Sequence, residues 1–360
     1  MKKNLFATVL SIASISAGAV FGVDVDSRGS ATQDYSFILD SGNSISVSTS
    51  RVSPKVTGNY PDGSAISNPY ASVSVTQIEA KWDYKGTSLG ISTGSPYFGE
   101  LTYTDGVLTN SGAKVTSNET AIIASRSVGD GFKFFGGVRL NQFKATIDRA
   151  FIPGVYKYEV DTGTSTGFAV GAAYEVPQIM LRASIQYNTE IKHKKAKETE
   201  TVANVSSETT PNDMIAPSSM IIKLRSALSP RLLAYANWRS SQYKDFVVSG
   251  TLGGELHNPE SGNDLTVGIA LKVNDKLNVA LGAARGQSKD TGGLASALAP
   301  YKGTSTQFLG ASFKINDQVE LNAAYALTSF GDASANVVSG TGVFEDNKAS
   351  RVTLGTKINF

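Results

Sequence analysis

The chain ends in RVTLGTKINF (residues 351–360), where apolar and polar side chains alternate up to the last residue. One parity carries Val352, Leu354, Ile358 and Phe360, and the other carries Arg351, Thr353, Lys357 and Asn359. A period of two indicates a β-strand with two different faces. Chain ends usually fray in water, so the question is which solvent each face of this last strand meets.

The same alternation recurs along the chain after residue 43. It predicts about fourteen strands, at residues 44–53, 71–84, 88–97, 113–128, 131–147, 158–175, 178–193, 215–228, 231–245, 263–273, 277–287, 304–315, 318–329 and 347–360. Short turns such as Lys85-Gly86 and Asn274-Asp275 alternate with long loops rich in Gly, Ser, Thr, Asn and Asp. Short turns on one side and long loops on the other are typical of an outer-membrane barrel, and an even count returns the C-terminus to the periplasmic side. We therefore predict an all-β fold, a transmembrane antiparallel β-barrel.

The charged residues decide which parity faces lipid. A Lys or Arg at the lipid-facing midplane costs roughly 2–4 kcal/mol, and a whole domain is stable by only roughly 5–15 kcal/mol. The basic residues that share one parity of the predicted strands are Arg182, Lys223, Arg225, Lys272, Lys314, Arg351 and Lys357. We therefore expect these charges to face a wet lumen and the Val, Leu, Ile and Phe side chains to face lipid. Phe360 is then expected in the periplasmic aromatic girdle, where the barrel-assembly machinery would meet it.

The N-terminus predicts export. Met1-Lys2-Lys3 is basic, residues 5–20 are apolar, and Ala17-Gly18-Ala19 resembles a cleavage site. We expect a signal peptide at residues 1–19 and location in the bacterial outer membrane; the alternative, a first transmembrane helix, is disfavoured by the short apolar run. Residues 20–43 are expected to form a short hatch or plug in the lumen, with a short helix within residues 30–39, or alternatively a loose periplasmic tail. Residues 44–360 are the predicted barrel.

Composition narrows the function classes. Lys and Arg number 33 against 31 Asp and Glu, so there is no electrostatic case for nucleic acid. Cys is absent, which removes disulfides and thiolate metal sites. No phosphate-binding loop is present and no cofactor is expected. A Gly-x-Ser-x-Gly pattern at residues 163–167 lacks strand–turn–helix context, and the two histidines, His193 and His257, fall on predicted loops, so we do not expect an enzyme.

Several stretches resemble the FadL/TodX-type outer-membrane transporters of long-chain fatty acids and other hydrophobic compounds. They are VDSRGS (25–30) with Gly42-Asn43, RVSPKVTG (51–58), GSPYFGE (94–100), VGAAYEVPQIMLRASIQYNTEI (170–191) and FEDNKASRVTLGTKINF (344–360). The resemblance implies a fourteen-stranded barrel, an N-terminal hatch, ligand capture at extracellular loops, and a distorted third strand that opens sideways. The long hatch with an Asn-Pro-Ala motif is missing here, and Asn68-Pro69-Tyr70 does not replace it.

The end of the third predicted strand is the candidate lateral gate. Gly94, Pro96 and Gly99 lie close together there. Proline cannot donate to a ladder and glycine marks bulges, so this stretch is either a broken ladder that leaves a gap to the membrane or a plain strand end running into a loop.

The candidate substrate-binding residues are of two kinds. The apolar ones are Phe98, Phe151 and Ile152, and the lumenal basic ones are Arg139, Arg182, Arg225 and Arg351. Apolar outer loops, which also include residues 101–103 and 294–300, would collect a hydrophobic ligand or, alternatively, pack on one another as a cap. The basic residues would bind a substrate carboxylate or pair with lumenal acids such as Glu79 and Glu320.

The sequence thus predicts passive outer-membrane transport of hydrophobic molecules, with long-chain fatty acids as the main class. The ligand would be captured at extracellular loops and would leave through the lumen and a lateral opening near the third strand. The alternative is a general diffusion porin or a structural barrel. Expected partners are the hydrophobic ligand, outer-membrane lipid, and lipopolysaccharide, whose phosphates the basic run at residues 192–195 would meet.

Overall fold

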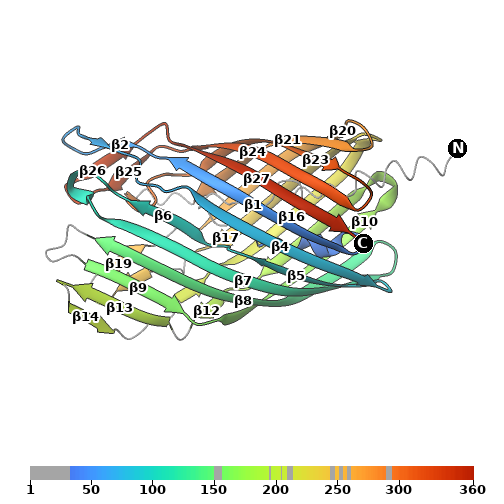
Figure 1. Cartoon of the computed structure of the whole chain (residues 1–360), viewed down its shortest axis with the longest axis horizontal. Coiled ribbons are helices and arrows are strands. Elements are labelled where there is room, and N and C mark those ends of the chain that lie inside the picture. Colours follow the sequence, from blue (N-terminus) through green and yellow to red (C-terminus); the bar gives the residue numbers. More distant parts are fainter. Residues whose placement is uncertain are drawn as a thin grey trace.

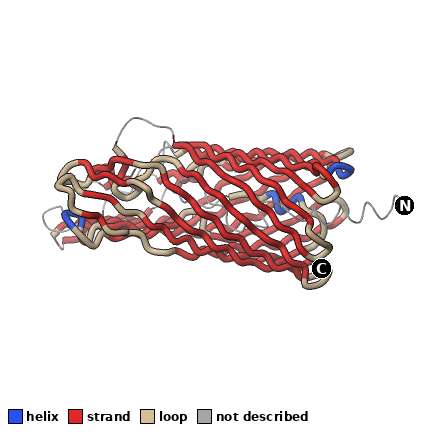
Figure 2. Tube along the Cα trace, turned by 90° about the horizontal axis from the view of Figure 1, so that it is seen from above, coloured by secondary structure: helices blue, strands red, loops and turns tan. Residues whose placement is uncertain are grey.

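The structure, a computed structural model, describes residues 33–149, 156–193, 196–203, 205–208, 214–243, 248–250, 254–257, 261–288 and 294–360. These residues form an antiparallel β-barrel whose strands run obliquely along the long axis (Figures 1 and 2). The fourteen positions in its wall are occupied by β1 (Ser44–Lys55), β4 (Val73–Tyr84), β5 (Thr87–Gly94) with β6 (Phe98–Thr102), β7 (Gly112–Val128), β8 (Phe132–Arg149), β9 (Tyr156–Thr162) with β10 (Ser165–Val176), β11 (Leu181–Asn188), β16 (Ser218–Ser229), β17 (Leu232–Gln242), β20 (Gly262–Lys272), β21 (Leu277–Ser288), β23 (Thr304–Lys314), β24 (Val319–Phe330) and β27 (Lys348–Asn359). The predicted fold class and strand positions are confirmed.

The first and last strands close the barrel. β1 pairs with β27 from Ser44 opposite Asn359 to Lys55 opposite Lys348, and its other edge pairs with β4. All pairings between neighbours in the wall are antiparallel. Closure satisfies the strand edges, which hydrocarbon requires because it offers no hydrogen bonds.

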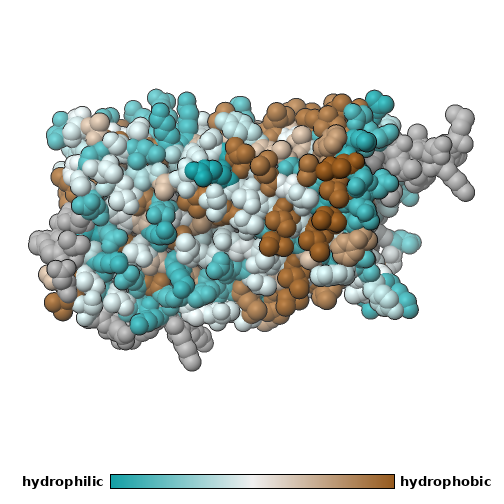
Figure 3. Space-filling view, in the orientation of Figure 1, coloured by the Kyte–Doolittle hydropathy of each residue, from teal (hydrophilic) through white to brown (hydrophobic). Residues whose placement is uncertain are grey.

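The predicted sidedness is also confirmed. Leu354 is 61% exposed on the outer surface whereas Lys357 is 9% exposed, and Ile269 and Lys272 differ in the same direction, at 37% and 5%. Figure 3 shows the apolar side chains gathered in a band near the end where the C-terminus lies, with polar residues beyond it on both sides. Phe360 is 55% exposed at that end.

The two ends of the barrel differ. At the end near the C-terminus the hairpins are tight. Lys85 and Gly86, for example, form a two-residue turn with φ of 48° and 76°. Both values lie in the left-handed region that two-residue hairpin turns use. The short helices η1 (Ser36–Leu39), η2 (Gly106–Leu108) and η3 (Pro177–Ile179) make up the described helical structure. No described helix has the length and apolar character needed to cross a bilayer.

The long connections contain more strands than expected. Four regions predicted as loops hold β2 (Gly58–Asn59), β3 (Ala65–Ile66), β13 (Ala196–Val202), β14 (Val205–Glu208), β18 (Val248–Gly250), β19 (Gly254–His257), β25 (Ala333–Asn336) and β26 (Thr341–Phe344), and β22 (Ala295–Ser296) lies in a fifth. The ends of the predicted strands 178–193 and 215–228 form a separate pair, β12 (Ile191–His193) with β15 (Met214–Ala216). The prediction that His193 and His257 lie on loops is therefore wrong, since both end strands. Figure 1 shows β2, β13, β14, β19, β25 and β26 at the end of the barrel away from the C-terminus.

Part of this far end is a packed cap. Strands β22, β25, β26, β2 and β3 form one small sheet. The Tyr103 hydroxyl donates to the Ala297 carbonyl at 2.6 Å, and the Tyr70 hydroxyl donates to the Leu298 carbonyl at 3.1 Å. The apolar loops at residues 101–103 and 294–300 therefore pack on each other, which is the alternative that the sequence left open for them. Phe151 and Ile152 lie outside the described residues.

Candidate functional site

The third strand of the wall is interrupted. β5 ends at Gly94, opposite Glu119, and β6 begins at Phe98, opposite Thr116. Three residues, 95–97, therefore face two residues of β7, 117–118. One extra residue in one strand is a β-bulge, which breaks the local ladder and bends the strand. Of the residues named for the candidate lateral gate, Gly94 ends β5, Pro96 lies in the bulge and Gly99 lies in β6, and β5 ends earlier than the predicted strand, at 94 rather than 97.

The interruption is wider on the β4 side. β4 pairs with β5 only from Ile78 opposite Thr93 to Tyr84 opposite Thr87. Farther along, the connection resumes through the Ala71 amide, which donates to the Glu100 carbonyl at 2.9 Å, and through a bridge between Tyr70 and Leu101. Residues 73–77 of β4 therefore pair with β1 but have no ladder partner in the described third strand.

Phe98 fills this interruption. Leu101 of β6 is buried, which places odd-numbered residues of β6 inside and Phe98 on the outer parity. Phe98 nevertheless packs against Val75 of β4, which belongs to the inward row. The half-buried phenyl ring therefore reaches across the gap between the two strands. The preceding residue, Tyr97, turns into the lumen, where its ring meets Phe143 edge to face at 6.4 Å between centroids.

Residues 33–43, here called the plug segment, lie inside the barrel. Its Tyr35, Ile38 and Leu39 are each no more than 3% exposed. Gly90 of β5 gives the segment room, because a Cβ at that position would lie 2.7 Å from the Phe37 ring. The Gly42 amide donates to Asp83 at 2.8 Å, close to the tight Lys85–Gly86 turn. The segment therefore sits at the end of the lumen near the C-terminus.

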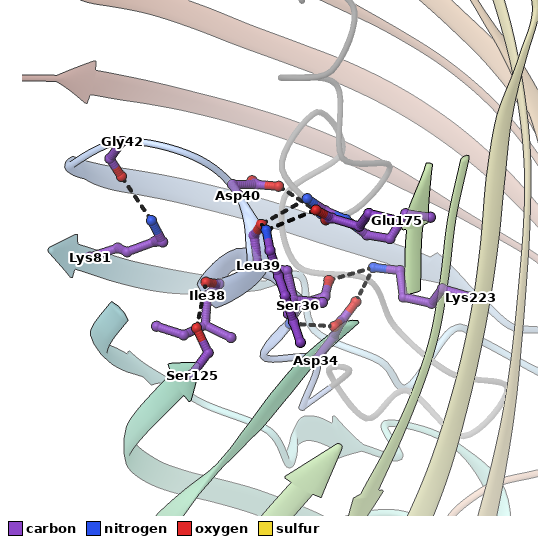
Figure 4. A network of polar contacts seen from close by, with 12 residues as sticks. Asp34, Ser36, Ile38, Leu39, Asp40, Gly42, Lys81, Ser125, Glu175 and Lys223 are labelled. Carbon is purple, nitrogen blue, oxygen red and sulfur yellow. Dashed lines mark hydrogen bonds and ion pairs between the residues drawn. The ribbon is translucent and has the colours of Figure 1, made fainter. Parts of the chain in front are cut away.

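Ion pairs hold the plug segment to strands from around the wall. Asp34 pairs with Lys223 of β16, whose Nζ also donates to the Ser36 hydroxyl at 2.9 Å; Figure 4 shows these groups turned toward one another. Arg182 of β11 bridges Asp40 and Glu175 at 2.9 and 2.6 Å and donates to the Leu39 carbonyl. The segment thus contributes acids, and the wall contributes the bases that neutralise them.

A second network of ion pairs and hydrogen bonds in the lumen surrounds Glu119. Glu119 of β7 accepts from Arg139 Nη2 and from Gln33 Nε2, both at 2.9 Å, and from the Tyr35 hydroxyl. Arg139 is fully buried. A buried charge is tolerated when it is paired and hydrogen-bonded, and here the plug segment completes the set of partners.

The lumenal arginines predicted as carboxylate ligands therefore fall into two groups. Arg139 and Arg182 bind protein carboxylates, from Glu119, Asp40 and Glu175 rather than from the expected Glu79 and Glu320. Arg225 lies directly across from Arg182 in the register of β11 and β16, and Arg351 lies on the inward parity of β27. The acids Glu119 and Glu175 were missed, although both stand on the inward parity of predicted strands, which is the signal that would have found them.

A small pocket joins the plug segment to the interruption. It is lined by residues 33–35 of the plug segment and by side chains of β4, β5 and β7, and it borders Gly94 and Pro96 directly. Its volume is about 30 Å³, and a water molecule needs about 10–15 Å³ on this measure. The pocket therefore holds about two waters and does not admit an acyl chain in this conformation.

A closed fourteen-stranded barrel with a lumen plugged at one end and a broken third strand defines a class of outer-membrane-type fold. No family model matches the sequence, and no curated protein matches it. Among solved structures, a Pseudomonas aeruginosa FadL homologue is 14% identical with a TM-score of 0.73, covering 96% of each chain. The Pseudomonas putida toluene transporter TodX is 13% identical with a TM-score of 0.66, covering 95% of this chain and 100% of its own. The CymD monoaromatic hydrocarbon channel is 11% identical with a TM-score of 0.66, covering 95% and 98%. The chain therefore has the FadL/TodX-type fold, as the sequence resemblance implied.

Proposed function

We propose that the protein carries hydrophobic small molecules passively across the outer membrane, with long-chain fatty acids as its main substrates. The ligand is captured at the extracellular loops, enters the lumen, and leaves sideways into the membrane between β4 and the third strand. The similar solved structures include proteins named as a toluene transporter and a monoaromatic hydrocarbon channel, which supports a hydrophobic substrate.

One observation carries the proposal: the wall is interrupted, and the plug segment blocks the lumen on the side of the C-terminus. The plug segment occupies the end of the lumen near the C-terminus, while the bulge at residues 95–97 leaves part of β4 without a ladder partner. An apolar molecule gains roughly 0.8 kcal/mol for each CH₂ that it transfers out of water. A sideways exit would therefore keep the ligand out of the aqueous periplasm.

The register gives a sharp test. Deleting Pro96 leaves two residues opposite two on the β7 side, and we expect β5 and β6 then to pair with β7 as one strand. We expect this deletion to slow uptake of a labelled long-chain fatty acid toward the rate of cells that lack the protein. The matched control is Pro96→Ala, which removes the proline but keeps the extra residue, and it should retain most of the uptake.

The porin alternative predicts different results. It requires steady ion conductance in planar bilayers, passage of small sugars, and no effect of the Pro96 deletion on fatty-acid uptake. Binding of a substrate carboxylate by Arg139, Arg182, Arg225 or Arg351 remains a prediction. Arg139 and Arg182 would have to exchange a protein carboxylate for that of the ligand.

A further inference from the structure

A row of exposed residues crosses five neighbouring strands on the outer surface of the barrel. Its members lie directly opposite one another in the register of β21, β23, β24, β27 and β1, and they are Arg285, Ser305, Ser329, Lys348 and Lys55. All five are exposed, and none is acidic. Another basic residue, Arg51, is exposed on the same face of β1, four positions before Lys55. The four basic residues, Arg51, Lys55, Arg285 and Lys348, are here called the basic row.

The basic row borders the apolar band on the side away from the C-terminus. Four residues closer to the C-terminal end along each strand, the outward side chains are apolar and 46–55% exposed: Leu281, Leu309, Tyr325 and Val352. Arg51 lies directly opposite the last of these, Val352.

The height of the basic row matches the head-group region of the outer leaflet. Lys55 is eleven positions beyond Ser44, the residue that starts β1 at the C-terminal end. With a rise of about 3.3 Å per residue and a tilt of about 40°, Lys55 stands roughly 28 Å from that end along the barrel axis. The apolar band of an outer-membrane barrel is about 25 Å tall. Arg51 and Arg285 start nearer the band, and their long side chains can reach the same level.

The protein does not neutralise the charges of the basic row. Lys55 and Lys348 stand directly opposite each other on adjacent strands, and like charges in this position destabilise a sheet. No side chain of the basic row forms an ion pair or hydrogen bond with the described residues. The acids Asp332, Glu345 and Asp346 lie in the connections that follow β24 and precede β27, and Asp332 accepts from the Asp346 amide at 3.2 Å.

Exposed lysines elsewhere on the outer surface have acid partners. Lys114 pairs with Glu100 at 2.9 Å, Lys144 with Asp161 at 2.6 Å, and Lys192 with Glu190 at 3.3 Å. The last of these lysines belongs to the basic run at residues 192–195 that the sequence assigned to lipopolysaccharide, and Lys194 and Lys195 lie outside the described residues. The basic row is therefore a better candidate for binding an external anion than that run.

We propose that the basic row binds the phosphate groups of a phosphorylated outer-leaflet glycolipid of the lipopolysaccharide class, whose acyl chains lie against the neighbouring apolar side chains. Guanidinium groups bind phosphate in a bidentate manner, and ammonium groups bind it as compact charges. A phosphate between Lys55 and Lys348 would also relieve their repulsion. The adjoining apolar surface favours a lipid over a free anion, because it provides a place for the tail as well as for the head group. The bound lipid would span the seam where β1 meets β27, and this inference does not depend on what the barrel transports.

Native mass spectrometry of the purified, delipidated full chain tests the proposal. The probes are lipid A with two phosphates, the same lipid with both phosphates removed, and phosphatidylglycerol. EDTA is present so that no divalent cation links a phosphate to the acids near the basic row. We expect the protein to retain only the phosphorylated lipid A. The double variant Lys55→Gln/Lys348→Gln should bind it more weakly by a factor of about 30, since each cation near an anionic lipid contributes a factor of about 5.

The matched control is Lys114→Gln/Lys144→Gln, which also removes two exposed lysines but takes them from pairs with acids. It should bind lipid A like the wild type. Equal retention of the phosphate-free lipid or of phosphatidylglycerol, equal weakening in both double variants, or no weakening in the first would each overturn the inference. Displacement of lipid A by millimolar inorganic phosphate would overturn it too, because the site would then be one for a small anion.

Thermal unfolding in detergent provides a second readout. Lipid A should raise the unfolding temperature of the wild type, because a ligand that binds only the folded state stabilises it, and it should not raise that of Lys55→Gln/Lys348→Gln. Without lipid, this variant should unfold at no lower temperature than the wild type, since it removes a like-charge pair. A lower temperature would show that the two lysines support the fold directly and would contradict the proposal.

Discussion

The hydroxyl of Ser117 satisfies both backbone groups of Tyr97 in the bulge: it accepts from the Tyr97 amide at 2.8 Å and donates to the Tyr97 carbonyl at 2.9 Å. Both residues are buried. A bulge removes ladder partners from the strand that carries it, and this side chain replaces them. The interruption in the wall is therefore a supported conformation, maintained by a specific residue on the neighbouring strand.

Removing that hydroxyl should destabilise the barrel. In Ser117→Ala the two backbone groups of Tyr97 lose their partner, and a buried unsatisfied group costs about 1–3 kcal/mol. We expect a lower temperature for the shift from the folded to the unfolded band in detergent gels. Ser127→Ala, an exposed serine on the same strand, is the control and should have no such effect. Equal stability of the two variants would mean that Ser117 does not support the bulge.

Phe98→Ala should open the interruption. The ring packs with Val75 across the gap, so its loss removes the side chain that fills the wall. We expect uptake of a hydrophobic probe to rise, with a stability loss below the roughly 3–5 kcal/mol typical of a fully buried phenylalanine, since Phe98 is only half-buried. Phe134→Ala removes an exposed outer aromatic residue instead. If uptake falls in the first variant or rises equally in both, Phe98 does not close the gap.

Gly90→Val should displace the plug segment. The new side chain would overlap Phe37 and Ile38, where a Cβ alone already lies at 2.7 and 2.8 Å; overpacking of this kind typically costs about 1–3 kcal/mol. We expect ion conductance in planar bilayers to increase as the lumen opens. At Gly163 an added Cβ has no atom within 4 Å, so Gly163→Ala should conduct like the wild type. Unchanged conductance in Gly90→Val would show that the plug segment does not block ions.

Lowering the pH should protonate the Asp40 carboxylate and so weaken its ion pairs between the plug segment and the wall. Burial by itself would raise the pKa of the Asp40 carboxyl. The positive charges of Lys357, Arg182 and Arg225 outweigh burial and lower this pKa from 3.8 to about 2. A lowered pKa means that the stabilisation is complete above about pH 4 and is lost as the pH falls through about 2, by about 2 kcal/mol in total.

Conductance recorded between pH 7 and pH 2 checks this. We expect the wild type to stay closed down to about pH 4 and to open below it, whereas Asp40→Asn should already be open at neutral pH and lack that step. A wild type that opens between pH 7 and pH 5 would contradict the role of Asp40.

The sequence predicted the barrel well because one simple pattern governs it. Alternation in segments such as residues 351–360 records which side chains meet lipid, and closure and sidedness follow from that. The extracellular strands were missed because a segment such as Ala196–Val202 carries polar residues on both parities and reads as a loop.

The candidate site was predicted only in part. Gly94 and Pro96 marked the interruption locally, but the contacts of the plug segment could not be predicted. Asp40, Glu175 and Arg182 are far apart in the chain and meet only because the wall closes around them. Phe98 was selected as an apolar residue, and its position across the gap depends on the register shift, which a single sequence does not contain.

That register shift amounts to one residue, three opposite two. At the level of the gene, the bulged and the unbulged pairing with β7 would therefore differ by a single codon. An in-frame loss of three nucleotides anywhere within positions 95–97 would remove the extra residue opposite β7. Among natural variants of this chain, length at this point should therefore be a better marker of a transporting barrel than the identity of any of the three residues.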